Sequence, residues 1–277
     1  MWRKQRVSLI LPTYNERDSL FEAVADAWDC GYVDEVIVVD NNAAAGSDAE
    51  ARRAGARVVH EPVQGYGAAI RRGLREASGD LLVVSEPDGT FAAHDIVKLL
   101  GYSDDFDVVY GTRTTLQLIW GGANMGWFLR VGNMAVAKFA EFMFNTTQLT
   151  DVGCTMRLLR RSAYEQMAPR FSVDGAHFGA EMMVLSFLVG HRTIQVPVNY
   201  RSRVGVSSVT GNRWYAIRVG LRMLGLIIRY RLTERQRARV PERETWSIET
   251  TGRVVGGIAG AEEESGVSVE AVARTAP

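Results

Sequence analysis

Short apolar runs alternate with amphipathic segments over the first 110 residues of the chain. The apolar runs cover residues 7–11, 35–40, 57–60, 81–85 and 107–110, each about the length of one strand. Between them, apolar residues recur at helical spacing over residues 19–28, 48–54, 67–77 and 94–102. Strands that are apolar throughout and separated by helices are typical of a parallel sheet with both faces covered. The pattern therefore predicts an α/β, Rossmann-like fold with a mostly parallel sheet and helices on both of its faces.

A different pattern occupies residues 212–231, where one apolar stripe follows a predicted helix. The stripe consists of Ile217, Leu221, Leu224 and Ile228, and three arginines, Arg218, Arg222 and Arg229, lie off it. Such a helix can pack on its own domain. It can equally lie in a membrane interface with its arginines among the lipid headgroups. The sequence predicts a C-terminal amphipathic helix and leaves both positions open.

Composition divides the chain into three parts. Residues 1–211 contain the predicted sheet and a segment at 120–144 that is rich in Trp, Phe, Met and Gly. Residues 212–232 form the amphipathic helix. From residue 233 the chain is charged, and later it is rich in Gly, Ala, Glu and Ser, which is typical of disorder. We expect one folded domain, one amphipathic helix, and a largely disordered tail over residues 233–277.

Charge and cysteine content exclude several classes of protein. The 277 residues include 32 Lys and Arg against 32 Asp and Glu, so the chain has no electrostatic preference for nucleic acid. Cys30 and Cys154 are too few and too far apart for a disulfide framework or a zinc site, which favours a reducing, cytoplasmic location. No run of about 18 uncharged apolar residues occurs, so we expect no transmembrane span.

Two carboxylates follow the predicted strand at residues 81–85. Glu86 and Asp88 are separated by one proline and precede a glycine, so a strand end fixes them while the turn leaves them exposed. Oxygen ligands in this arrangement suit a hard divalent cation such as Mg²⁺ or Mn²⁺, which keeps ligand positions for phosphate oxygens. An ordinary polar turn is the alternative interpretation.

Polar residues also lie at the ends of two other predicted strands, in the turn at residues 12–16 and at Asp40. In open parallel sheets, ligands bind beyond the carboxyl ends of the strands, so these groups are expected to converge on one edge. A nicotinamide or flavin site is excluded, because Gly65-Tyr66-Gly67 is followed by Ile70 where a dinucleotide fingerprint has its third glycine. Neither a Walker phosphate loop nor a Gly-x-Ser-x-Gly elbow occurs.

An ordered series of motifs runs through residues 7–231. It comprises Leu-Pro-Thr-Tyr-Asn-Glu at 11–16, Val-Val-Asp-Asn-Asn at 38–42, Gly-Tyr-Gly-Ala-Ala at 65–69, Gly-Asp at 79–80, Glu-Pro-Asp at 86–88, Gly-Thr-Arg at 111–113, Asp-Val-Gly-Cys-Thr-Met-Arg at 151–157 and Arg-Val-Gly-Val-Ser-Ser at 203–208. The series resembles family 2 glycosyltransferases of the GT-A fold, and within them the polyprenyl-phosphate sugar transferases of the dolichyl-phosphate mannose synthase group. The resemblance implies that residues 1–211 form a GT-A catalytic domain.

The resemblance also implies roles for individual residues. The nucleoside would be held by Pro12, Tyr14, Glu16 and Asp40, with Asn42 supporting them. Asp88 would bind the metal, with Glu86 standing where the family more often has aspartate. Gly65 and Gly67 would let the backbone approach the nucleotide sugar, although close packing explains such glycines equally well. The diphosphate or the acceptor phosphate would be bound by Arg113, Arg130 and Arg203, each of which could instead form a surface ion pair.

The implied reaction is transfer of a sugar, with inversion, from a nucleotide diphosphate to a polyprenyl phosphate, with Mg²⁺ or Mn²⁺ as the cofactor. The enzyme would work at the cytoplasmic face of a membrane, with the segment at 120–144 receiving the polyprenyl chain. A second hypothesis is transfer to a glycan hydroxyl, which needs a carboxylate base, and Asp151 and Glu181 are the candidates. A third is a membrane-surface scaffold without catalysis, since Glu86 departs from the family and a lysine is missing near residues 206–208.

Overall fold

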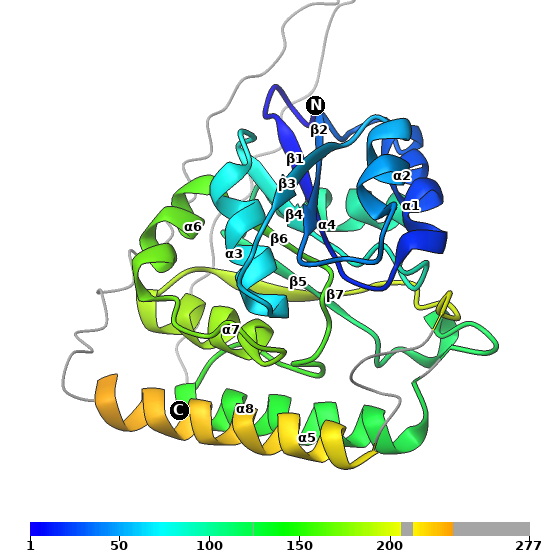
Figure 1. Cartoon of the computed structure of the whole chain (residues 1–277). Coiled ribbons are helices and arrows are strands. Elements are labelled where there is room, and N and C mark those ends of the chain that lie inside the picture. The colour runs from blue at the N-terminus through cyan, green and yellow to red at the C-terminus, as the bar shows by residue number, and fades with distance from the viewer. Residues whose placement is uncertain (124, 206–212, 235–277) are drawn as a thin grey trace, which may run out of the picture. The chain divides into compact units, whose positions relative to one another are not determined.

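The computed structural model describes residues 1–123, 125–205 and 213–234 (Figure 1). The chain divides into two units, Met1–Val240 and Pro241–Pro277, and the second lies outside the described residues. The motif at 206–208 and the predicted tail from residue 235 onward also fall outside them.

Seven strands form one sheet in the order β3-β2-β1-β4-β6-β5-β7. Their bounds are β1 (Val7–Thr13), β2 (Glu35–Asp40), β3 (Arg57–His60), β4 (Leu81–Val84), β5 (Val108–Thr112), β6 (Arg157–Arg160) and β7 (Thr193–Pro197). All neighbouring pairs are parallel except those of β6, which runs antiparallel to both β4 and β5. The five predicted strands are confirmed, and β6 and β7 were not predicted.

Helices cover both faces of the sheet. They are α1 (Arg17–Asp29), α2 (Ser47–Arg53), α3 (Tyr66–Glu76), α4 (Ile96–Tyr102), α5 (Trp127–Phe144), α6 (Arg161–Met167), α7 (Phe178–Val189) and α8 (Arg213–Glu234), with short 3₁₀ turns η1 (Ala93–Asp95), η2 (Leu116–Leu118) and η3 (Ala168–Arg170). Alternate residues of one strand enter different cores: Ile10 packs with α3 and α7, whereas Leu9 and Leu11 pack with α1 and α4. The predicted α/β fold with two covered faces is confirmed.

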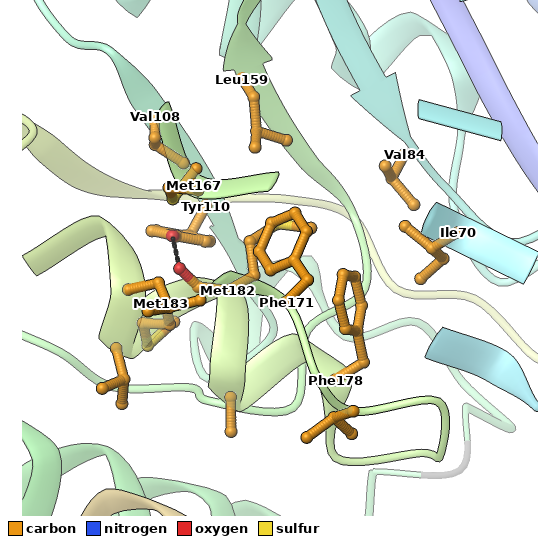
Figure 2. Packing of buried hydrophobic residues seen from close by; sticks show 14 of the residues in the cluster. Ile70, Val84, Val108, Tyr110, Leu159, Met167, Phe171, Phe178, Met182 and Met183 are labelled. Carbon is orange, nitrogen blue, oxygen red and sulfur yellow. Dashed lines mark hydrogen bonds between the residues drawn. The ribbon is translucent and has the colours of Figure 1, made fainter. Parts of the chain in front are cut away.

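The core around α7 contains the largest buried side chains. Figure 2 shows Tyr110, Phe171 and Phe178 packed together with Met182 and Met183 of α7. The Tyr110 hydroxyl, which lies among these apolar groups, donates to the Ser186 hydroxyl oxygen at 2.9 Å, and the Met182 carbonyl oxygen lies 3.4 Å away. The polar atom is therefore satisfied where it is buried.

Helices α5 and α8 lie side by side along one margin of the domain (Figure 1). The predicted C-terminal helix is confirmed as α8, but the face that packs on the domain consists of Val219, Met223, Leu226 and Ile227. Three residues of the predicted apolar stripe face outward, since Ile217, Leu221 and Ile228 are 40%, 63% and 42% exposed, whereas the fourth, Leu224, is half-buried and packs against the core. In the described part of the chain, no helix has the length and the apolar character needed to cross a membrane.

Candidate active site

The acidic turn after β4 is the centre of the site. Asp88 is completely buried, and its Oδ1 accepts hydrogen bonds from the backbone N–H and the hydroxyl of Thr90. Its Oδ2 accepts no hydrogen bond among the described residues, and Arg203 Nη1 lies 3.1 Å away as an ion-pair partner. One oxygen of Asp88 is thus fixed by the turn, and the other faces the site.

Glu86 adds a second carboxylate at the same place. Burial, followed by the charge of Asp88, raises the pKa of Glu86 to about 8, against the opposing effects of Arg203 and Arg113. Among the described residues, no group of three or more acidic, His or Cys side chains could hold a metal ion. Two carboxylates with an unbonded oxygen fit a Mg²⁺ or Mn²⁺ ion that takes its other ligands from phosphate and water.

Arg203 joins the acidic turn to the turn after β1. Its Nη2 donates to Glu16 Oε1 at 2.9 Å while Nη1 faces Asp88. Glu16 Oε2 accepts the backbone N–H groups of Tyr14 and Asn15, both at 2.8 Å. The Tyr14 side chain remains 44% exposed, so its ring is available for stacking, while Pro12 is buried within β1.

Asp40 lies next to this turn because β1 and β2 pair in parallel, with Thr13 opposite Asp40. Asp40 Oδ1 accepts the N–H of Ala43 at 2.8 Å, and the side chain remains partly exposed. Asn42 has a φ of 56° and donates to Gln64 Oε1 at 3.0 Å. Asp40 and Asn42 therefore border the same edge as residues 12–16.

Asn41, which the sequence analysis did not single out, organises the neighbouring loop. Its side chain is 4% exposed and donates to the carbonyls of Glu61 and Val63 at 2.8 and 2.7 Å. Its Oδ1 accepts the N–H of Gly65 at 2.8 Å. The sequence did place Asn41 directly after β2, which is where ligand-binding residues are expected. It did not reveal that the side-chain amide is buried.

The glycines of the 65–69 motif make a close contact within the protein. A Cβ at Gly67 would lie 2.5 Å from the Val173 carbonyl oxygen, and a Cβ at Gly65 would lie still closer to that of Asp174. These contacts favour the packing explanation for both glycines. Between them, Tyr66 was also missed: burial, and then the charge of Glu86, raise the pKa of Tyr66 well above its usual value.

Arg113 and Asp151 form a buried bidentate ion pair. Arg113 Nε lies 2.8 Å from Asp151 Oδ2, and Arg113 Nη2 lies 3.0 Å from Oδ1. Burial acts to raise the pKa of Asp151, but the charge and hydrogen bonds of Arg113 outweigh it, so that this pKa is lowered. The guanidinium also stacks over Tyr200 at 5.2 Å. With both oxygens occupied, Asp151 orients Arg113 and is poorly suited to accept a proton.

Arg130 and Glu181 are not joined to these residues. Arg130 lies in the first turn of α5, and the described residues give its guanidinium no carboxylate partner. Glu181 is completely buried in α7 and accepts hydrogen bonds from Ser172, Val173 and Tyr230. The structure therefore brings together Glu16, Glu86, Asp88 and Arg203, places Asp40 beside them, and leaves Glu181 in another network.

Comparison with known proteins agrees with this architecture. A family model described as glycosyl transferase family 2 matches residues 8–168. An uncharacterized glycosyltransferase of Mycobacterium bovis is 32% identical over 208 residues, covering 74% of this chain and 90% of the relative. A dolichyl-phosphate hexose transferase of Haloferax volcanii is 29% identical, covering 72% of this chain and 84% of the relative.

Solved structures are similar in fold. Glucosyl-3-phosphoglycerate synthase from Mycobacterium tuberculosis, crystallised with Mn²⁺, uridine diphosphate and phosphoglyceric acid, superposes with a TM-score of 0.63 at 18% identity. The match covers 82% of this chain and 78% of that enzyme. At this identity the likeness shows the α/β fold alone.

Proposed function

The chain belongs to glycosyl transferase family 2, and on this basis we propose that it transfers a sugar from a nucleotide diphosphate to a polyprenyl phosphate, with inversion. The proposal rests on one observation: two carboxylates and a bridging arginine meet at the end of β4, where an oxygen of Asp88 is left without a hydrogen bond. Arginines and carboxylates so placed can bind a diphosphate and a cation together.

Residues beside the acidic turn would hold the donor. The exposed ring of Tyr14 can stack on a base, and the carboxylates of Glu16 and Asp40 can accept hydrogen bonds from the base or the ribose. Asn41 and Asn42 fix the loop at residues 61–65 against this edge. Gly65 and Gly67 contribute by allowing the first turn of α3 to pack closely.

Asp88 and Glu86 would hold a Mg²⁺ or Mn²⁺ ion, which supplies positive charge to the leaving diphosphate. Arg203 is already directed at Asp88, and it can turn one side of its guanidinium to a phosphate oxygen. Arg113, held rigid by Asp151, keeps a fixed positive charge near the same turn, where it opposes the rise in the pKa of Glu86 that burial and Asp88 cause.

Both carboxylates that could act as a catalytic base are already engaged by other residues. This favours an acceptor that is itself anionic and needs no base. Asp151 is fully engaged with Arg113, and Glu181 with Ser172, Val173 and Tyr230. A hydroxyl acceptor would need such a base, whereas a phosphate oxygen is already ionised at neutral pH. The acceptor phosphate would be positioned by Arg203 and Arg130, and the name of the Haloferax relative supports a lipid-linked phosphate.

The outward face of α5 and α8 supports a membrane location for the acceptor. Trp127, Trp214 and Phe142 are 72%, 80% and 82% exposed, and Trp127 and Trp214 line a hollow of about 350 Å³ together with Phe128 and Ile217. On α8, Arg218, Arg222 and Arg229 flank the exposed apolar stripe. Aromatic and apolar side chains bordered by arginines suit a bilayer interface, and the hollow suits isoprenoid units. Cys30 and Cys154 are free thiols, and we therefore propose that the enzyme works at the cytoplasmic face of the membrane.

Two experiments test the proposal. Thermal shifts of the purified protein across nucleotide sugars, with and without Mn²⁺, identify the donor, and a catalytically inactive scaffold would show no metal-dependent shift. The donor is then assayed with a short-chain polyprenyl phosphate and with simple glycosides. Product from the polyprenyl phosphate is expected. Product from the glycosides alone would instead establish transfer to a hydroxyl.

A further inference from the structure

Glu181 joins the beginning of α7 to residues 172–173, which lie just before it, and to α8, whose Tyr230 lies 49 positions later. Its carboxylate, completely buried in the first turn of α7, accepts the hydroxyl of Ser172 at 2.6 Å and the N–H of Val173 at 3.0 Å. The hydroxyl of Tyr230, from α8, donates to Glu181 Oε1 at 2.9 Å. A buried carboxylate that loses a hydrogen bond is left with an unsatisfied polar atom, which destabilises the fold. Glu181 therefore fixes both α8 and the 171–174 segment relative to α7.

The same segment holds the beginning of α3. The carbonyl oxygen of Asp174 accepts the N–H groups of Gly67 and Ala68 at 2.8 and 3.2 Å, and its side chain pairs with Arg71 at 2.7 Å. The first N–H groups of a helix have no partner within the helix, so an external carbonyl anchors them. The absence of a Cβ at Gly65 and Gly67 lets this backbone approach closely.

From α3 the contacts continue to the donor edge. Gly65 donates its N–H to Asn41 Oδ1 at 2.8 Å, and Asn41 directly follows Asp40 at the end of β2. Hydrogen bonds and adjacent backbone thus connect Tyr230 to the edge next to Asp40. Along this path Glu181 and Asn41 are buried, whereas Ser172 and Asp174 are exposed.

We infer that Glu181 is a positioning residue that couples the placement of α8 to the donor-binding edge. The inference rests on the proposed function, in which α8 contacts a membrane and the edge next to Asp40 binds the nucleotide of the donor. When α8 docks on a bilayer, any change at Tyr230 is passed through Glu181 to residues 172–174 and to the first turn of α3. Because such coupling is reciprocal, nucleotide binding and membrane docking change each other's affinity.

The decisive variant is Tyr230→Phe, which removes one hydroxyl and keeps the ring. Amide hydrogen exchange is measured on the full chain in the variant and the wild type. We expect exchange about tenfold faster at Ser172 and Val173 and also at Gly67 and Ala68, as follows from losing one hydrogen bond to a charged group. Tyr164→Phe is the matched control, because its ring packs on Phe171 beside the same segment. Unchanged exchange at Gly67 and Ala68, or equal acceleration in the control, would overturn the inference.

A binding measurement adds a functional readout. Affinity for UDP and for GDP, each with Mn²⁺, is measured with and without vesicles of phosphatidylcholine and phosphatidylglycerol. In the wild type, vesicles should change nucleotide affinity several-fold, while in Tyr230→Phe vesicle binding should persist and the change should disappear. An equal vesicle effect in both proteins would contradict the coupling. If neither nucleotide binds either protein, the proposed function fails, and hydrogen exchange at Gly67 and Ala68 still decides the inference.

Discussion

Arg203 Nη1 lies 3.1 Å from Asp88 Oδ2, so the described structure already gives this carboxylate a positive partner from its own chain. Backbone contacts hold the same segment in place: Arg201 donates its N–H to the Thr90 carbonyl and Val204 to that of Asp88, both at 2.9 Å. A cation that binds Asp88 must share the oxygen with Arg203 or displace it. The residue proposed to bind phosphate is therefore also a competitor of the metal.

This competition gives the first prediction. Arg203→Gln should tighten binding of Mn²⁺ alone by about tenfold, because a positive charge leaves the carboxylate pair, and it should weaken binding of the nucleotide diphosphate. Isothermal titration calorimetry measures both. Arg201→Gln is the control, since the Arg201 guanidinium stacks on Trp120 at 4.8 Å instead of pairing with Asp88. Weaker Mn²⁺ binding in Arg203→Gln would show that the arginine supports the cation.

The metal assignment itself is tested by Asp88→Asn. The side chain keeps its shape but loses its charge, so metal-dependent turnover should fall by about a hundredfold or more while the fold is retained. Initial rates with and without a chelator measure the first effect, and circular dichroism measures the second. Asp80→Asn, at the opposite end of β4, is the control, because its carboxylate accepts the N–H of Arg6. Full activity of Asp88→Asn, or wild-type activity in the presence of chelator, would contradict the assignment.

An element of the fold could be predicted where the hydrophobic pattern of its own residues reflects how it is buried. Strands β1 to β5 each contain consecutive apolar residues and alternate with helical segments, so they were found, including β3, which begins at Arg57 and ends at His60. β6 is a four-residue strand with an arginine at each end, and it is inserted antiparallel between β4 and β5 by contacts distant in sequence. α7 is buried continuously from Phe178 to Ser186, so it has no polar face and no helical period to detect.

The site was predictable where residues lie at strand ends and not where distant residues pair. Glu86 and Asp88 could be placed at the end of β4, but the exposure predicted for them was wrong, because the fold buries Asp88 completely and Glu86 in part. The contact between Glu16 and Arg203 spans 187 positions, and only folding shows that it exists. Asp151 and Glu181 were read as possible bases from residue type and position, whereas their buried partners engage both carboxylates. Type and spacing indicate which groups can react, but burial and pairing decide whether they are available.

Acid unfolding tests the pair of Arg113 and Asp151. A carboxyl group with a lowered pKa in the folded chain stabilises the fold above its unfolded value, here 3.8, and that stability is lost as the pH falls through the lower, folded value. Asp151→Asn should therefore cost about 3 kcal/mol at pH 7, because Arg113 is left buried without its partner, and should flatten the dependence of stability on pH below about 4. Urea unfolding from pH 7 to 3 measures both effects.

The control for this pair is Asp105→Asn, at an exposed position before β5. It should change the unfolding free energy by no more than about 0.5 kcal/mol. If the unfolding free energy of Asp151→Asn fell as steeply below about pH 4 as that of the wild type, other carboxylates would be responsible for the pH dependence. Equal stability of the two variants at pH 7 would mean that the buried pair is not needed by the fold.

The last prediction separates the two apolar faces of α8. Leu221 is 63% exposed and points away from the domain, whereas Ile227 is completely buried against it. Leu221→Glu should reduce co-sedimentation with anionic vesicles by about tenfold or more, since an apolar contact is replaced by a repelled charge, and should leave the melting temperature nearly unchanged. Ile227→Ala should instead cost about 2–5 kcal/mol of stability. Tyr102→Glu, an exposed position on α4, controls for added charge, and equal loss of vesicle binding there would remove α8 as the docking surface.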